Sequence, residues 1–187
     1  MDDGLHVALS QGDLRLEPLT EAHREGLRAA IAADGEIWAV YPFDYAGEAF
    51  DPRFDWLLAG PPQRRPYAIL RDGVVVGMTA WIERGAPGWS IEIGNSFILP
   101  ELRGTGFNRR VKRLMLDHAF ACGLKRVEFR VDERNQRSQG AVLKLGAVKE
   151  GVLRAERITW TGHVRDTGVF SILAEEWAGE PSLRSSP

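Results

Sequence analysis

One ten-residue stretch, from Leu99 to Asn108, limits what this chain can fold into more than any other part of it. It reads Leu-Pro-Glu-Leu-Arg-Gly-Thr-Gly-Phe-Asn, and it lies between an apolar run (91–98) and an amphipathic segment (107–122). A strand that ends in a glycine-rich turn and leads directly into a helix leaves backbone N–H groups unpaired beside the positive end of the helix dipole. The sequence therefore predicts an anion site at this turn, and phosphate is the usual anion.

Basic residues crowd the first two turns of the predicted helix, where cations oppose the helix dipole. They are Arg109, Arg110, Lys112 and Arg113. An isolated helix would be more stable with acidic residues at these positions. The arrangement is favourable if a polyanion binds near this end and uses the positive charges.

The turn does not match the two best-known phosphate loops. A dinucleotide fingerprint requires a third glycine, and Arg109 occupies that place after Gly104 and Gly106. A P-loop requires Gly-Lys-Ser/Thr, which this stretch lacks. An ordinary strand-to-helix turn, in which glycine serves only local geometry, is the alternative.

Composition restricts the remaining possibilities. The chain has 187 residues with 44% hydrophobic and 27% charged residues, which predicts one globular domain over residues 1–177 and a disordered tail over residues 178–187. The net charge of −2 provides no general attraction to nucleic acid or to an anionic membrane. One cysteine allows no internal disulfide and no metal-ligand cluster, so we expect no metal. The acidic N-terminus does not resemble a signal peptide, and a cytoplasmic location is the expectation.

Periodicity and turn signals predict an alternation of strands and helices. Asp72-Gly73 is the strongest hairpin signal, and Gly94 suggests a bulge within its strand. We expect strands at 13–18, 67–70, 74–83, 89–98, 126–131, 148–160 and 163–173, and helices at 20–33, 34–40, 51–59 (capped by Asp51), 107–122 and 135–145.

The central turn resembles the Arg/Gln-x-x-Gly-x-Gly/Ala signature of the GCN5-related N-acetyltransferases. Arg103 and Gly106 match it, while Asn108 stands where the family has a small residue. Glu92-Ile-Gly94, the segment 132–138 and Leu145-Gly146 extend the resemblance, which covers residues 13–177 and is most similar to the RimJ/RimL-like ribosomal-protein branch. It implies an α/β (α+β) fold with a central mixed, mostly antiparallel, splayed sheet of about seven strands flanked by helices.

The resemblance also implies that acetyl-coenzyme A is the cosubstrate. The turn would hold its pyrophosphate, Arg109 would reach another phosphate, and the strand before the turn would offer backbone partners to the pantetheine arm. The side chains of that strand are expected to be ordinary core. The expected cofactor-binding residues are Phe97, Ile98, Leu99, Arg103, Gly104, Thr105, Gly106, Phe107, Asn108, Arg109, Asn135 and Ser138.

Three residues are candidates for proton transfer. The resemblance makes Ser138 a candidate to protonate the leaving thiolate; otherwise it is a polar residue in the first turn of a helix that Asn135 caps. Glu92 alternates with Ile91 and Ile93, so it faces away from them, and it could act as a base for the amine. Glu156 is the second carboxylate that could do so, and either one could instead form an ion pair with a neighbouring arginine.

The acceptor amine is not identified by the sequence. Trp38, Tyr41, Trp81 and Trp160 are expected to bound its pocket, although aromatic residues can also simply cover a sheet edge. A protein N-terminus fits the branch, and a small amine or antibiotic-like amine is the rival. A non-catalytic acyl-coenzyme A sensor of the same fold is a further alternative. The oligomeric state stays open, with a homodimer among the possibilities.

Overall fold

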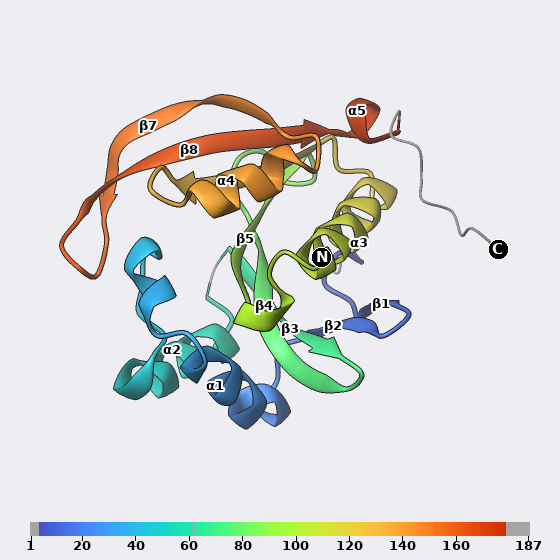
Figure 1. The fold of residues 1–187 in the computed structure, drawn as a ribbon. Coiled ribbons are helices and arrows are strands. Elements are labelled where there is room, and N and C mark those ends of the chain that lie inside the picture. Colours follow the sequence, from blue (N-terminus) through green and yellow to red (C-terminus); the bar gives the residue numbers. More distant parts are fainter. Residues whose placement is uncertain (1–3, 62, 179–187) are drawn as a thin grey trace.

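The computed structural model describes residues 4–61 and 63–178. One eight-stranded sheet forms the centre of the molecule, with the order β1-β2-β3-β4-β5-β6-β8-β7 (Figure 1). Its strands are β1 (Leu9–Gln11), β2 (Leu14–Pro18), β3 (Arg64–Arg71), β4 (Val74–Ile82), β5 (Ser90–Ile98), β6 (Arg126–Asp132), β7 (Val148–Ile158) and β8 (Val164–Leu173). The expected strands are all present, and β1 is the one that the sequence did not predict.

Five α-helices and four short 3-10 helices complete the described structure. The α-helices are α1 (Arg24–Ala32), α2 (Phe50–Leu58), α3 (Phe107–Ala121), α4 (Gln136–Leu143) and α5 (Ala174–Ala178). The 3-10 helices are Glu21–His23, Glu36–Val40, Gly47–Ala49 and Pro100–Leu102. All but one of the residues of the expected disordered tail lie outside the described residues.

The cap predicted for α2 is wrong. Its N-cap is Ala49, because the preceding 3-10 helix starts the helical turn before Asp51 is reached. The carboxylate of Asp51 instead accepts hydrogen bonds from Arg24 and Arg28 of α1. Ion pairing with the neighbouring helix therefore replaces capping as its role.

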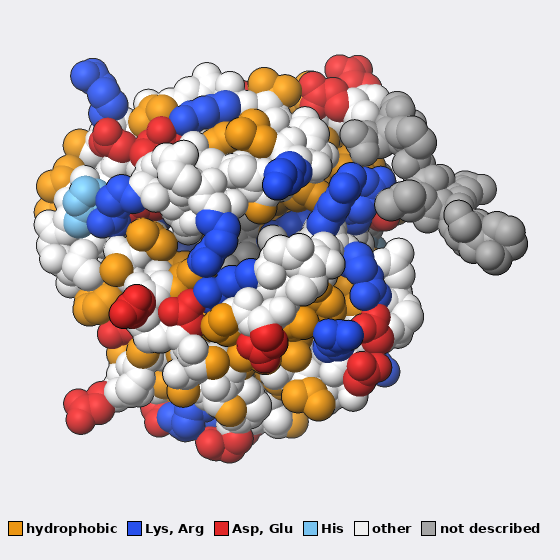
Figure 2. All heavy atoms as spheres, viewed as in Figure 1, with side chains coloured by type: hydrophobic (Ala, Val, Ile, Leu, Met, Phe, Trp, Pro, Cys, Tyr) orange, Lys and Arg blue, Asp and Glu red, His pale blue; other side chains and the backbone are white. Residues whose placement is uncertain are grey.

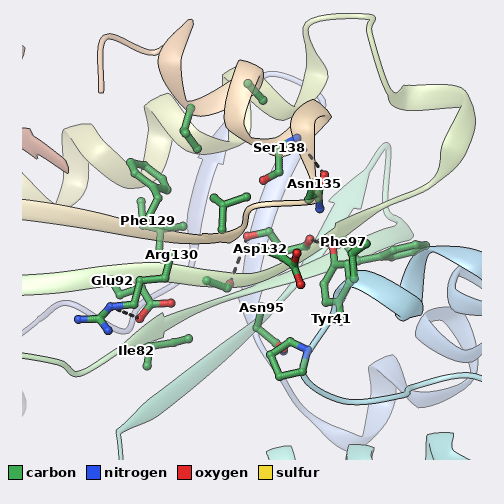
Figure 3. Close-up of a pocket in the computed structure, with 18 of the residues that line it drawn as sticks. Tyr41, Ile82, Glu92, Asn95, Phe97, Phe129, Arg130, Asp132, Asn135 and Ser138 are labelled. Carbon is green, nitrogen blue, oxygen red and sulfur yellow. Dashed lines mark hydrogen bonds and ion pairs between the residues drawn. The ribbon is translucent and has the colours of Figure 1, made fainter. Parts of the chain in front are cut away.

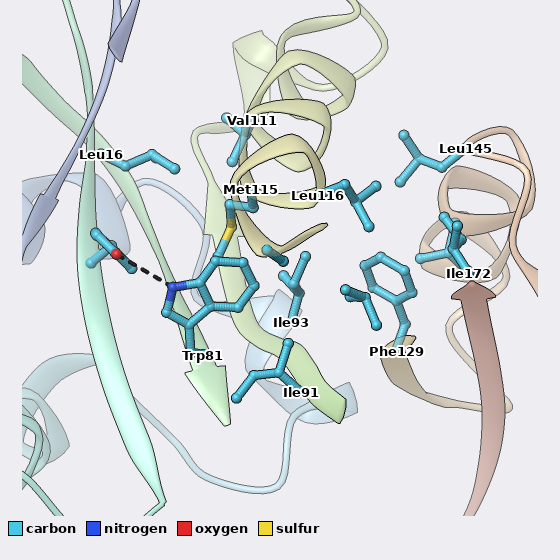
Figure 4. Close-up of a cluster of buried hydrophobic side chains, with 14 of the residues drawn as sticks. Leu16, Trp81, Ile91, Ile93, Val111, Met115, Leu116, Phe129, Leu145 and Ile172 are labelled. Carbon is cyan, nitrogen blue, oxygen red and sulfur yellow. Dashed lines mark hydrogen bonds between the residues drawn. The ribbon is translucent and has the colours of Figure 1, made fainter. Parts of the chain in front are cut away.

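Helices cover both faces of the sheet and bury two apolar clusters. The larger cluster joins α3 and α4 to one face, and Figure 4 shows Val111, Met115 and Leu116 of α3 packed over Trp81 and the strands. The smaller cluster joins α1 and α2 to the other face. Because successive side chains of a strand alternate between these faces, the strand position decides which layer each residue joins.

The sheet splits in its middle. Strands β5 and β6 are the parallel pair, and they pair only from Ser90–Arg126 to Glu92–Glu128. Beyond Glu92 the two strands separate. A bulge in β5 assists this: the register with β4 shifts between Met78 and Ala80, and Asn95, one residue after the glycine predicted to mark a bulge, has a φ of 52°. The divergence leaves the later part of β5 without a neighbour on that side.

Candidate active site

A cavity of about 260 Å³ occupies the split between β5 and β6 (Figure 3). Residues of α3, α4 and the segment 40–43 complete its wall. Side chains from both faces of the sheet contribute. Gly104, Asn108 and Ser138 come from the layer of α3 and α4, while Glu92 and Arg130 alternate with core residues of that layer and so point to the opposite face. The cavity therefore connects the two faces through the sheet.

The glycine-rich turn forms one end of this cavity. Gly104 and Gly106 have φ values of 77° and 88°, which glycine adopts without the strain that other residues incur. A Cβ atom built on either glycine would meet nothing within 4 Å, so the space above the turn is open. Within the described residues, the N–H groups of Gly104, Thr105 and Gly106 donate to no carbonyl oxygen. The turn thus presents the free donors that an anion requires.

Two other members of the predicted turn have structural roles. Thr105 Oγ1 donates to the carbonyl of Leu102 at 2.8 Å and accepts from the N–H of Phe107 at 3.3 Å. Phe107 itself is buried in the larger apolar cluster. Arg109 is exposed and does not line the cavity. Thr105 and Phe107 therefore shape and anchor the turn, and Asn108 lines the cavity.

Arg103 is fixed before any ligand binds. Its Nε donates to the carbonyl of Ile98 at 3.2 Å, and its Nη1 bonds the carboxylate of Asp34. The same guanidinium lies 5.5 Å from the ring centre of Phe97. Its Nη2 is buried and has no hydrogen-bond partner in the described structure. One donor of this cavity-lining side chain is consequently still available.

The end of β5 contributes less free backbone than expected. Phe97 and Ile98 line the cavity, as predicted for a strand beside the pantetheine arm. The N–H of Leu99, however, donates to the carbonyl of Val76 at 2.9 Å, which continues the ladder between β5 and β4. Leu99 does not line the cavity. Its N–H is used within the sheet, so the expectation of a backbone partner at Leu99 needs correction.

Asn135 and Ser138 lie together at the start of α4. The Asn135 Oδ1 accepts the N–H of Ser138 at 3.0 Å, so the capping interpretation of Asn135 is confirmed. Both residues also line the cavity (Figure 3). The Ser138 hydroxyl makes no hydrogen bond to another group of the described chain. The cap therefore fixes the backbone of Ser138 while its hydroxyl stays free in the cavity.

Glu92 lies within the cavity wall and is 5% exposed. Its Oε2 accepts a hydrogen bond from Nε of Arg84 at 2.5 Å, and Nε of Arg130 lies 3.8 Å away. Burial raises the pKa of Glu92, and the charges of Arg84 and Arg130 act against this increase. A Cβ on Gly94 would lie 2.8 Å from the other oxygen, so the glycine at that position leaves room for the carboxylate.

Glu156 does not line this cavity. Arg157 bonds both of its carboxylate oxygens, and Thr167 Oγ1 donates to one of them at 3.3 Å. The hydrogen bond from Arg157 is the largest effect that lowers the pKa of Glu156. A carboxylate with a lowered pKa accepts a proton poorly at neutral pH. The ion-pair alternative describes Glu156, and Glu92 is the one of the two candidates that faces the cavity.

Of the four aromatic residues predicted to contact the acceptor, one lines the cavity. Tyr41 lines the cavity and donates its hydroxyl to the carbonyl of Ser96. Trp38 is fully buried beneath it, with its ring centre 4.8 Å from that of Tyr41. Trp160 is 48% exposed and donates its indole N–H to the carbonyl of Trp38 at 2.8 Å. Trp38 and Trp160 thus support the wall that Tyr41 forms, and neither lines the cavity itself.

The prediction that Trp81 contacts the acceptor is wrong. Trp81 is fully buried in the larger apolar cluster, and its indole N–H donates to the carbonyl of Leu5 at 3.2 Å (Figure 4). Strand alternation explains the difference, since Trp81 points toward α3 while its neighbour Ile82 points to the other face and lines the cavity. The sequence does not reveal which face of β4 would be the acceptor side.

Sequence reasoning missed several charged residues of the cavity. Lys112 was interpreted only as part of the basic helix start, yet it is 4% exposed and lines the cavity. Its Nζ donates to Thr79 Oγ1 at 3.2 Å and to Ser96 Oγ, and burial lowers its pKa to about 7. The signal was its place four residues after Asn108 on the same helical face. Lys and Arg side chains also surround the hollow at the centre of Figure 2.

Two classes of site find no support in the described residues. No group of three or more His, Cys, Asp or Glu side chains there could hold a metal ion. None of the helices in residues 4–61 and 63–178 is long and apolar enough to cross a membrane.

Comparisons with known proteins agree with this geometry. The acetyltransferase (GNAT) domain matches residues 13–148. A solved structure from T. thermophilus, provisionally named an acetyltransferase, is 35% identical over 92% of this chain and 92% of that chain, with a TM-score of 0.82. Sequence comparison with curated proteins gives no match.

Two more distant structures share the fold. The spermidine N-acetyltransferase from Vibrio cholerae, solved with CoA and spermine, is 19% identical over 90% of this chain and 99% of that chain, with a TM-score of 0.71. The ribosomal-protein-S5-alanine acetyltransferase from Vibrio fischeri is 18% identical over 91% of this chain and 98% of that chain, also with a TM-score of 0.71.

The domain match includes the strands β2 to β6, the glycine-rich turn and the capped start of α4, and so covers most of the residues that line the cavity. The eight-stranded, mostly antiparallel sheet with its split between β5 and β6 agrees with the fold expected from the sequence. The chain belongs to the GNAT family of acetyltransferases.

Proposed function

We propose that this protein transfers an acetyl group from acetyl-coenzyme A directly to a primary amine. One observation carries the proposal: a single cavity joins the glycine-rich turn, with its free N–H groups, to the buried carboxylate of Glu92 on the other face of the sheet. A phosphate-bearing acyl donor and an amine acceptor can therefore enter from opposite faces and meet in the split.

The turn fits the pyrophosphate of acetyl-coenzyme A. Its N–H donors are unpaired, the space above both glycines is open, and the start of α3 adds the positive end of a helix dipole. Arg103 and Arg137 line the same cavity and add positive charge. In this proposal, Asn135 and the end of β5 hold the pantetheine arm, and Arg109 contacts a phosphate group outside the cavity.

The chemistry needs a neutral amine, because an ammonium group has no lone pair. Glu92 accepts the proton of the amine, directly or through water. The amine nitrogen then attacks the thioester carbonyl and a C–N bond forms; the C–S bond breaks as the nitrogen loses its second proton to water. The Ser138 hydroxyl gives the departing thiolate a proton and regains that second proton through the water. No acyl-enzyme is needed in this sequence.

The acceptor we propose is an α-amine, either at a peptide N-terminus or on a small molecule. A free α-amine has a pKa near 8 and a lysine amine near 10.4, so the α-amine costs roughly 3 kcal/mol less to deprotonate at neutral pH. The V. fischeri neighbour is named a ribosomal-protein-S5-alanine acetyltransferase, and the turn of this chain resembles that of the RimJ/RimL-like branch. Tyr41 and Phe43 would contact the apolar part of the first residues.

A competition experiment tests the proposal. A peptide with a free N-terminus is mixed with an N-blocked, lysine-containing twin, and thiol release and the site of acetylation are measured with acetyl-coenzyme A as donor. We expect modification of the free α-amine. Modification of the blocked twin at lysine would overturn the acceptor assignment. Tight binding of acetyl-coenzyme A without thiol release from any amine would instead support the non-catalytic sensor.

A further inference from the structure

Five arginines converge on the acceptor end of the cavity, on the sheet face opposite α3 and α4. They come from five separate places along the chain: the start of β3, the segment after β4, and strands β6, β7 and β8. We call Arg64, Arg84, Arg130, Arg157 and Arg165 the arginine cluster. A structure brings together so many cations at moderate burial only where anionic groups offset their repulsion.

Two members of the cluster have unsatisfied donors. The Nε atoms of Arg130 and Arg165 are buried and have no hydrogen-bond partner in the described structure. Arg165 is 5% exposed as a residue, and its closest carboxylate contact is a 3.9 Å approach to Asp132. Arg130 approaches Glu92 at 3.8 Å through Nε and Glu128 at 3.5 Å through Nη2. Buried guanidinium N–H groups normally have acceptors, so these donors indicate a missing acceptor.

The cluster also contains charges that repel each other. Arg157 and Arg165 are direct cross-strand partners in the β7–β8 ladder, an arrangement that like charges destabilise. Arg64 has no ion-pair partner among the described residues. Burial lowers the pKa of Arg64; Tyr45 and Glu92 act to raise it, and the charges of Arg84 and Arg157 act to lower it. An added anion would relieve this repulsion.

The protein's own carboxylates neutralise the cluster only in part, since Glu156 pairs with Arg157 and Glu128 lies 3.5 Å from Arg130. Two carboxylate side chains, Glu92 and Asp132, line the cavity. Glu92 is bonded to Arg84, and Asp132 accepts hydrogen bonds at 3.0 and 2.8 Å from Arg134, which does not line the cavity. A surplus of positive charge therefore faces the space where the acceptor would bind.

We propose that the acceptor amine carries a carboxylate and that the arginine cluster binds this carboxylate. The inference rests on the proposed function and narrows its substrate class. Guanidinium groups bind carboxylates through paired, charge-assisted hydrogen bonds, and the unpaired donors of Arg130 and Arg165 supply such bonds. The carboxylate belongs either to a free amino acid or to an acidic side chain near a peptide N-terminus. A polyamine is repelled by the same cluster.

Matched acceptors test the charge of the substrate. The peptide pair is Ala-Glu-Phe-amide and Ala-Gln-Phe-amide, which have the same N-terminal residue and differ by one carboxylate. The small-molecule pair is L-alanine and L-alanine amide, and spermidine is the cationic probe. We measure kcat/KM from thiol release, and binding to the coenzyme A-loaded protein by saturation-transfer NMR. The acid-bearing member of at least one pair should bind about tenfold more tightly than its amide.

Arg64→Gln tests the cluster itself, because Arg64 forms no ion pair in the described structure whose loss would disturb the fold. It should raise KM for the acid-bearing acceptor about tenfold, with little change for the amide and none in acetyl-coenzyme A affinity. Arg71→Gln is the control, since Arg71 lies at the far end of the same strand and pairs with Asp13. Arg71→Gln should leave the KM values of both acceptors and the affinity for acetyl-coenzyme A unchanged.

The outcomes separate this inference from the proposed function. Equal binding of acid and amide in both pairs, or tightest binding of spermidine, overturns the inference while acetyl transfer stands. The peptide pair and the alanine pair show which source of carboxylate is used. Absence of thiol release from every acceptor, together with a retained acid preference in the NMR measurement, rejects catalysis and leaves the arginine cluster as a carboxylate site.

Discussion

The Nε of Arg84 donates a 2.5 Å hydrogen bond to Oε2 of Glu92, inside the wall of the cavity that crosses the sheet. Burial raises the pKa of this carboxyl, and the cation beside it limits the increase. A base works best when its pKa approaches the operating pH, because it must be ionised and still attract a proton. Burial and the Arg84 cation thus act in opposite directions on the pKa of the carboxyl that we propose as the base.

Glu92→Gln should lower turnover most at low pH. The defect should shrink as the pH rises, because more of the amine is then already neutral. Glu156→Gln is the matched control: its pKa is lowered by Arg157 and it lies outside the cavity, so it should show no loss that grows as the pH falls. The measurement is kcat/KM from pH 6 to about pH 9. A loss in Glu92→Gln that does not vary with pH would point to positioning instead of proton transfer.

Gly106→Asp should abolish acetyl-coenzyme A binding. It introduces negative charge and bulk where the backbone must approach phosphate, at a φ of 88°. Gly123→Asp, at the other end of α3 with a φ of 89°, imposes the same backbone strain away from the turn and should bind normally. Calorimetry measures both variants, with NAD and ATP as competitors that should bind the parent protein much more weakly. Normal binding by folded Gly106→Asp would place the phosphate site elsewhere.

Ser138→Ala should lower kcat with little effect on acetyl-coenzyme A affinity. The cap from Asn135 is made to the backbone N–H of residue 138, so it survives the substitution. If the hydroxyl protonates the thiolate, an acyl donor whose thiol has a lower pKa, and therefore leaves more readily without a proton, should show a smaller loss. Pre-steady-state thiol release measures the step directly. An unchanged rate would assign the proton to water.

Lys112→Met should stabilise the protein, most strongly at low pH. Burial lowers the pKa of Lys112 from 10.5 to about 7, so between these values the unfolded chain binds more protons and the stability of the parent rises with pH. The advantage of the variant should therefore decline from pH 7 to pH 10, by roughly 1 kcal/mol per pH unit. Thr79 and Ser96 keep hydrogen bonds to the carbonyl of Gly94.

Urea unfolding at several pH values provides the measurement for Lys112→Met. Lys144→Met, a change at the exposed C-cap of α4, serves as the control and should show no such trend. An advantage of Lys112→Met that stays constant with pH would mean that the lysine is charged in the fold and has a counterion.

The sequence alone determined the order of the elements from β2 to β8 and the position of the turn. The conformation of a tight turn depends mainly on its own residues and little on the surrounding structure. Asp72-Gly73 therefore forms a hairpin, and the strand followed by Gly104 and Gly106 forms a turn with free N–H groups. Alternation was also sufficient to predict that Glu92 faces away from Ile91 and Ile93.

Only the tertiary structure decided which face each long strand presents to the cavity. Trp81 and Ile82 are neighbours in sequence, yet one is core and the other lines the cavity, because the packing of α3 selects the face. The arginine cluster joins positions as far apart as Arg64 and Arg165, which no local pattern relates. Burial of Lys112 likewise depends on which side of α3 meets the sheet, so its lowered pKa could not be predicted from its basic neighbours.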